Sequence, residues 1–190
     1  MTRRALIEST IQESLATKQR LLDDSNTLDA LEQLATRIQQ QLATGRKVLL
    51  AGNGGSAADA QHIAAEFVGR FEIERDALAA IALTTDTSAL TAIGNDYGFE
   101  HVFARQVSGL GQAGDIFIGI STSGNSANIV RAMEVARSKG LHTVALVGGK
   151  AGQMHALADT VLAAPSTRTA RIQECHILMM HLLCQLVDES

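Results

Sequence analysis

Short apolar runs that alternate with helical stretches constrain the fold of this chain more than any other feature. Five such runs occupy residues 48–50, 80–83, 116–120, 143–147 and 160–162. Runs this short, without polar alternation, are typical of strands that are buried on both faces of a sheet. The intervening segments have helical periodicity, at residues 57–70, 86–108, 126–139 and 169–187. Strand alternating with helix predicts an α/β fold in which a five-stranded parallel sheet lies between two layers of helices.

Two amphipathic helices are expected before the first strand. Apolar residues recur there mostly at three- and four-residue steps, at Ile7, Ile11, Leu15, Leu22, Leu28, Leu31, Leu34, Ile38 and Leu42. Their apolar stripes need a surface to pack on, and another subunit is a plausible one besides the chain's own sheet. We therefore divide the chain into a helical extension for oligomerisation, residues 1–45, and one structural unit, residues 46–190.

Charge and composition exclude several kinds of partner. A net charge of −4 argues against a broad field that attracts nucleic acid or anionic lipid, and 3% aromatic residues leave little for base stacking. No segment approaches the ~20 apolar residues of a membrane span, so we expect a cytoplasmic protein with neither nucleic acid nor membrane as partner. Cys175 and Cys184 are expected to be free core thiols of a reducing compartment, with redox or metal roles as the alternative.

Two loops rich in small polar residues each follow a predicted strand and precede a helix. The first contains Gly52, Asn53, Gly54, Gly55 and Ser56, and the second is Ser-Thr-Ser-Gly-Asn-Ser at residues 121–126. Glycines allow close backbone approach, and N–H groups at a helix start and hydroxyls donate to oxygen anions. Each loop could also be an ordinary turn with a helix cap. The Walker pattern is missing and the dinucleotide fingerprint is met only loosely, so a small phosphorylated molecule fits better.

His62 and Glu66 follow the first loop at a four-residue spacing and so share one helix face. An imidazole and a carboxylate placed there can form a proton-transfer pair, bind a divalent metal, or form a surface ion pair. Arg70 continues this face, where it either reaches an anion or is solvated.

Further candidates lie elsewhere in the chain. On the last helix Gln173 and His181 fall on one face, and His181 is either a core residue or a ligand. Asn95 and Asp96, after the second strand, could bind sugar hydroxyls or belong to a capped turn.

Taken in order, residues 52–62, 94–96, 121–126 and 171–174 resemble the phosphoheptose isomerase family, the sedoheptulose 7-phosphate isomerases of the sugar isomerase (SIS) fold. The resemblance covers nearly the whole chain. It implies a flavodoxin-like, three-layer fold in which residues 46–190 form the SIS domain. It also implies a homotetramer with active sites between subunits. The implied reaction converts sedoheptulose 7-phosphate to D-glycero-D-manno-heptose 7-phosphate, towards ADP-heptose and the bacterial lipopolysaccharide core.

The resemblance also implies roles for particular residues. Glu66 would be the general base and His181 the second acid or base, moving a carbonyl between C2 and C1 through an enediol. Some family members carry zinc, whose ligands here would be His62, Glu66, Gln173 and His181. The substrate would be bound by residues of the loops and of the neighbouring helices, namely Gly52, Asn53, Gly54, Ser56, Arg70, Asn95, Asp96, Ser121, Thr122, Ser123, Ser126 and Gln173.

One position departs from the family pattern. Some isomerases have an acidic residue where Ala170 stands, and residues 168–171 look closer to related proteins that bind the replication initiator DnaA. Those relatives tend to lack the catalytic glutamate, whereas Glu66 and His181 are both present here. The enzyme is therefore the favoured interpretation, with a non-catalytic scaffold for the initiator as the alternative.

Overall fold

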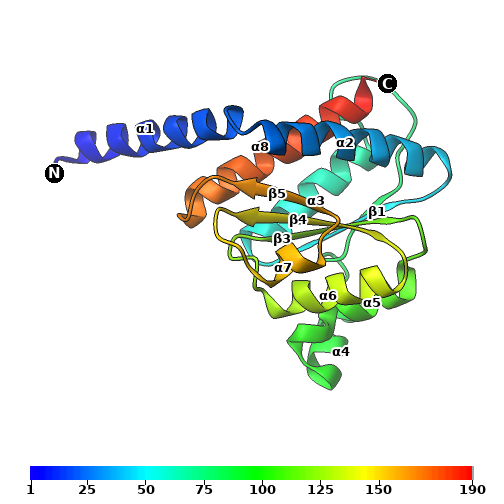
Figure 1. Ribbon diagram of the computed structural model, residues 1–190. Helices are drawn as coiled ribbons and strands as arrows, with labels where there is room; N and C mark the ends of the chain where they lie inside the picture. The colour runs from blue at the N-terminus through cyan, green and yellow to red at the C-terminus, as the bar shows by residue number, and fades with distance from the viewer. Residues whose placement is uncertain (190) are drawn as a thin grey trace.

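The computed structural model describes residues 1–189 and contains a five-stranded, wholly parallel sheet (Figure 1). The strand order is β2-β1-β3-β4-β5. The strands are β1 (Val48–Gly52), β2 (Ala80–Ala82), β3 (Ile116–Ser121), β4 (His142–Gly148) and β5 (Thr160–Ala164). The α/β fold expected from the alternating runs is therefore confirmed.

Helices cover both faces of the sheet (Figure 1). One face carries α2 (Ser25–Ala43), α3 (Gly55–Val68) and α8 (Thr169–Asp188). The other carries α4 (Thr87–Tyr97), α5 (Val102–Leu110), α6 (Ala127–Ser138) and α7 (Gln153–Leu157). Leu50 and Ile118 point into the first core, and Leu49 and Phe117 into the second. Because alternate residues of one strand enter different cores, the strands read as continuous apolar runs.

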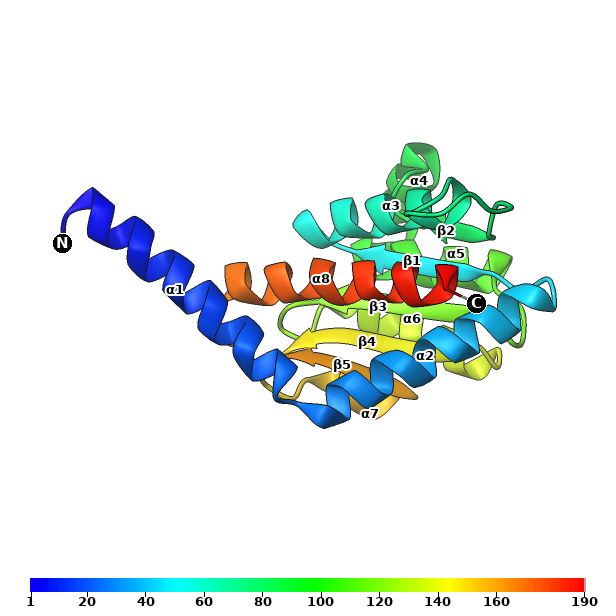
Figure 2. The ribbon, with the colours of Figure 1, turned by 90° about the horizontal axis from the view of Figure 1, so that it is seen from above.

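Helix α1 (Arg3–Leu22) projects away from the body of the molecule (Figures 1 and 2). Its contacts with the body of the molecule include a hydrogen bond from Arg171 to the carbonyl of Thr10 at 2.7 Å and one from Ser14 to the Glu174 carboxylate at 2.7 Å. Large apolar residues of its first four turns stay exposed in the single chain, at Leu6, Ile7, Ile11 and Leu15. An apolar stripe left in solvent is typical of a surface that another chain covers.

Two details differ from the sequence-based expectations. The helical stretch 86–108 is interrupted at Gly98, whose φ of +93° cannot continue a helix, and a short 3-10 turn (Phe99–His101) separates α4 from α5. Asn95 and Asp96 lie in the last turn of α4, inside the predicted helical stretch, so the alternative of a capped turn does not hold. Helix α7 was not predicted, because five residues are too few to show a period.

Both thiols are free and buried, as expected. Across residues 1–189 no helix combines the length and the apolar character that a membrane crossing requires.

Candidate active site

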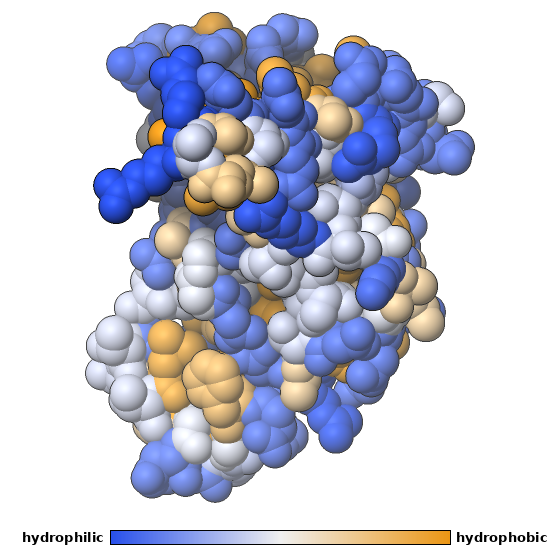
Figure 3. Space-filling view, turned by 90° about the vertical axis from the view of Figure 1, so that its left-hand side faces the viewer, coloured by the Kyte–Doolittle hydropathy of each residue, from blue (hydrophilic) through white to orange (hydrophobic). Residues whose placement is uncertain are grey.

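The strand order places the two polar loops side by side. It reverses between β1 and β3, and in such sheets a crevice opens at the carboxyl ends of the two strands that flank the reversal. Asn53 in the loop after β1 and Asn128 at the start of α6 exchange two side-chain hydrogen bonds, both of 2.9 Å. Figure 3 shows this side of the molecule, where pale residues of intermediate hydropathy, as glycine, serine and threonine are, gather across the middle.

The first loop leads directly into the N-terminus of α3. Gly54 has a φ of +56° and stands at the N-cap, where no side chain bonds to the first turn. Gly52 needs its lack of a side chain, because a Cβ there would lie 2.5 Å from the carbonyl oxygen of Ser56. The uncapped first turn of α3 therefore faces the crevice with its positive dipole end, which favours an anionic or oxygen-rich ligand.

The second loop gathers three hydroxyls. The Oγ of Ser121 lies 2.8 Å from that of Ser126 and 3.3 Å from that of Ser123. Ser126 is the N-cap residue of α6, yet its hydroxyl bonds to Ser121 and not to the helix. A hydroxyl cluster beside a second uncapped helix start has the composition of a phosphate site.

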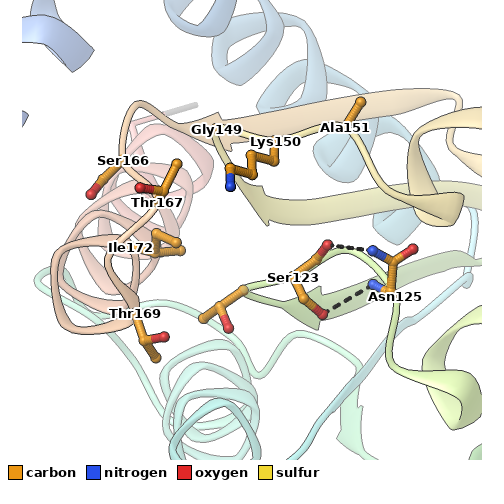
Figure 4. A pocket seen from close by; sticks show the side chains of 10 residues that line it. Ser123, Asn125, Gly149, Lys150, Ala151, Ser166, Thr167, Thr169 and Ile172 are labelled. Carbon is orange, nitrogen blue, oxygen red and sulfur yellow. Dashed lines mark hydrogen bonds between the residues drawn. The ribbon is translucent and has the colours of Figure 1, made fainter.

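A cavity of about 320 Å³ adjoins the second loop (Figure 4). It is lined by Thr122, Ser123, Asn125, Gly149, Lys150, Ala151, Ser166, Thr167, Thr169 and Ile172. Half of these residues bear hydroxyls, none bears a carboxylate, and Figure 4 shows the Lys150 side chain among them. The lining therefore suits an anion.

Four polar residues of this lining were not predicted as site residues from the sequence, namely Lys150, Ser166, Thr167 and Thr169. They follow β4 and β5, so the rule that pointed to the first two loops could have found them.

The acid and base candidates of α3 and α8 meet through His62. Its Nε2 lies 3.0 Å from Nε2 of His181 and 3.5 Å from Oε1 of Glu66. Both distances are measured from the same atom, Nε2 of His62. The distance from Oε1 of Glu66 to Nε2 of His181 therefore cannot exceed their sum. The ring of Phe71 stacks on His181, with centroids 5.4 Å apart. The Glu66 side chain is 23% exposed, so it is sheltered yet accessible to a ligand.

Two further groups adjoin this chain of side chains. Burial raises the pKa of Asp59, one helical turn before His62, while His62 and His181 partly oppose that shift. Sequence reasoning missed Asp59, although its three-residue spacing from His62 signals a shared face. Gln173 approaches the start of α3, since a Cβ on Gly55 would stand 2.9 Å from its Nε2. The face of α8 that bears Gln173 and His181 therefore points toward α3.

Three predicted substrate-binding residues lie apart from this cluster. Arg70 is exposed and pairs with Glu74 at 3.5 Å. Asn95 and Asp96 are exposed on α4 and bond to each other at 2.8 Å. Within residues 1–189, no hydrogen bond or ion pair joins these three residues to the others that were predicted.

The donor atoms fit the chemistry of zinc, although they are not arranged as a metal cage. Two imidazoles and a carboxylate form a common zinc ligand set, and ligand atoms about 3.3 Å apart suit tetrahedral zinc. His62 lies at comparable distances from His181 and Glu66. However, no group of three or more His, Cys, Asp or Glu in the described part of the chain is already placed around one ion.

Comparison with known proteins agrees with this geometry. The sequence profile of the SIS domain matches residues 12–148. A phosphoheptose isomerase of Aneurinibacillus thermoaerophilus is 54% identical over 97% of this chain and 93% of its own length, and one of Sulfurimonas denitrificans is 52% identical over 97% and 94%. The solved phosphoheptose isomerase of Neisseria gonorrhoeae superposes with a TM-score of 0.93 at 47% identity, covering both chains fully. That of Francisella tularensis gives 0.95 at 39% identity, also with full coverage. These relatives give the initiator-binding alternative no support, and the chain belongs to the phosphoheptose isomerase family of SIS domain proteins.

Proposed function

We propose that this protein is an aldose–ketose isomerase that converts sedoheptulose 7-phosphate to D-glycero-D-manno-heptose 7-phosphate. The observation that carries the proposal is the Glu66–His62–His181 chain of side chains, because α8, which carries His181, also contributes Thr169 and Ile172 to the hydroxyl-lined cavity free of carboxylates. The names and high identity of the relatives support the same substrate.

The reaction requires proton transfers at two neighbouring carbons and their oxygens. Glu66 takes the proton from C1, which leaves its electron pair to form the enediol double bond, and returns a proton to C2. His181 gives a proton to the C2 carbonyl oxygen as the enediol forms, and takes one from the C1 hydroxyl as the C1 carbonyl forms. No net oxidation occurs, since the carbonyl formed at one carbon balances the one lost at the other.

Binding of the phosphate fixes the sugar for these transfers. The hydroxyls of Ser121, Ser123 and Ser126 and the start of α6 supply neutral donors. Lys150 supplies a cation from the opposite side of the cavity (Figure 4). Asn53, Gly54 and Gln173, around the start of α3, are placed to orient the sugar hydroxyls.

We also propose a zinc ion held by His62, Glu66 and His181, with Gln173 as a fourth ligand. Bound there, it would polarise the substrate carbonyl and stabilise the enediolate charge. The two imidazoles and the carboxylate support zinc, whereas an amide is an unusual ligand for it.

A homotetramer would cover the exposed stripe of α1 at Leu6, Ile7 and Ile11. Active sites between its subunits would allow Asn95, Asp96 or Arg70 of one chain to serve the site of another. Light scattering on a sizing column measures the mass of the assembly, and a monomeric protein would contradict the proposed tetramer.

We place the reaction at the start of ADP-heptose synthesis for bacterial lipopolysaccharide core.

The activity is tested by incubating the purified protein with sedoheptulose 7-phosphate and following both sugars by NMR. The expected result is interconversion of the two phosphates, with no conversion of unphosphorylated sedoheptulose. No turnover of the phosphate would refute the proposal. Metal analysis of the purified protein, followed by the assay with a chelator, tests zinc: a protein without zinc that keeps full activity would refute the metal site.

A further inference from the structure

A buried ion pair joins the irregular segment 69–79, after α3, to the end of α8. The Nε of Arg75 lies 2.6 Å from Oδ1 of Asp188, and the two side chains are 15% and 3% exposed. The other carboxylate oxygen of Asp188 accepts the backbone N–H of Glu72 at 3.3 Å. In Figure 1 this segment passes beside the C-terminal end of α8.

The same guanidinium also binds the carboxyl end of α3. Its Nη2 donates to the carbonyl of Glu66 at 3.0 Å, and its Nη1 donates to that of Phe67 at 2.9 Å. Carbonyls in the last turn of a helix lack partners within the helix, and a cation near a helix C-terminus is favoured by the dipole. Arg75 therefore stands at the carboxyl ends of two helices at once, and the planar fork of its donors suits this double contact.

Both helices carry a member of the proposed acid/base pair. The carbonyl that Arg75 binds belongs to Glu66 itself. His181 precedes Asp188 by seven residues, nearly two turns or roughly 10 Å along the axis, and so lies on the same side of α8. Phe71, from the segment that holds Arg75, stacks on the His181 ring. Segment 69–79 thus contacts both the end of α3, which carries Glu66, and α8, which carries His181.

We propose that Arg75, fixed by Asp188, is a positioning residue that sets the placement of Glu66 relative to His181. This inference rests on the proposed isomerase function. Arg75 touches neither substrate nor reacting atoms in this account. It fixes the last turn of α3 against the last turns of α8, and misplacement of a reacting group by about 1 Å can cost about 100-fold in rate.

Two variants separate positioning from stability. Arg75→Lys keeps a cation for Asp188 but cannot serve two carbonyls and a carboxylate together. The double variant Arg75→Met, Asp188→Leu removes the pair without leaving a buried charge, a replacement that proteins often tolerate. Arg131→Lys is the matched control, because Arg131 forms an exposed ion pair with Glu134 on α6.

Both test variants are expected to lower kcat about 10- to 100-fold and to leave KM within about twofold, since the phosphate is held by other loops. The control should match the wild type. NMR of the imidazole nitrogens should show altered His62 and His181 signals in Arg75→Lys, with the signal of buried His176 unchanged. A lowered melting temperature with wild-type kcat, or unchanged His62 and His181 signals, would overturn the inference. If the wild type shows no turnover, the proposed isomerase function is refuted. The NMR comparison still tests in that case whether Arg75 sets the positions of His62 and His181.

Discussion

Acidification should destabilise the protein through His176, which holds α8 on the sheet. Its Nε2 lies 2.9 Å from the carbonyl oxygen of Val147 in β4, so the neutral ring donates there, and its buried Nδ1 has no hydrogen-bond partner. Burial lowers the pKa of His176 from 6.5 to about 4, and the bond to Val147 opposes that shift only in part. A proton added at Nδ1 would be a buried donor with no acceptor.

The sign and size of the effect follow from linkage. Below pH 6.5 the unfolded chain takes up a proton at His176 that the folded chain accepts only near pH 4. The contribution of His176 to stability is therefore complete above pH 6.5 and is lost as the pH falls toward 4. At about 1.4 kcal/mol for each pKa unit, the loss reaches about 3 kcal/mol.

Urea unfolding at pH 7 and pH 4 measures this loss. His176→Gln can still donate to Val147 but does not titrate, so its free energy of unfolding should fall by about 3 kcal/mol less than that of the wild type over this pH range. His101→Gln, at a histidine whose side chain is 41% exposed, should behave as the wild type. Parallel losses in the wild type and His176→Gln would refute the assignment of a neutral buried histidine.

Two further predictions concern the phosphate loop and the buried thiols. Ser123→Ala should raise KM for sedoheptulose 7-phosphate about tenfold, because a hydrogen bond to a charged group is worth about 1.5–3 kcal/mol. Ser138→Ala, at an exposed hydroxyl on α6, is the control. Equal KM values in the wild type and both variants would contradict the phosphate assignment. Burial raises the pKa of Cys184 to about 12, so iodoacetamide should leave this thiol unmodified in the folded protein and alkylate it in urea. Rapid labelling of Cys184 in the native state, read by peptide mass spectrometry, would show that this core is open.

The sheet and its polar loops were predictable because their causes are local. Strands buried on both faces must read as continuous apolar runs, and loops at the carboxyl ends of parallel strands must meet at one edge. The four-residue spacing of His62 and Glu66 likewise fixes a shared helix face. These features needed no knowledge of tertiary packing.

The remaining features depend on contacts between distant segments. Residue spacing alone could not predict the contact between His181 and His62, because that contact depends on how α8 packs against α3. Only the family resemblance predicted that these two side chains lie together. Arg75 gave no signal because it lies in a segment without periodicity, and its partner Asp188 is near the other end of the chain. A capped turn at Asn95 and Asp96 stayed open as an alternative, because the helix break falls only two residues after Asp96, at Gly98.

Transfer of a carbon-bound proton by Glu66 is tested most directly by Glu66→Gln, with NMR detection of both sugar phosphates in D₂O. Glutamine has nearly the same size, and the bond from Arg75 is to the main chain, so the variant should fold as the wild type does. The wild type should interconvert the sugars and place deuterium on the reacting carbon. Glu66→Gln should do so about 10²- to 10⁴-fold more slowly, while Glu134→Gln on the exposed face of α6 should match the wild type. Turnover of Glu66→Gln at the wild-type rate would contradict the assignment of Glu66 as the base.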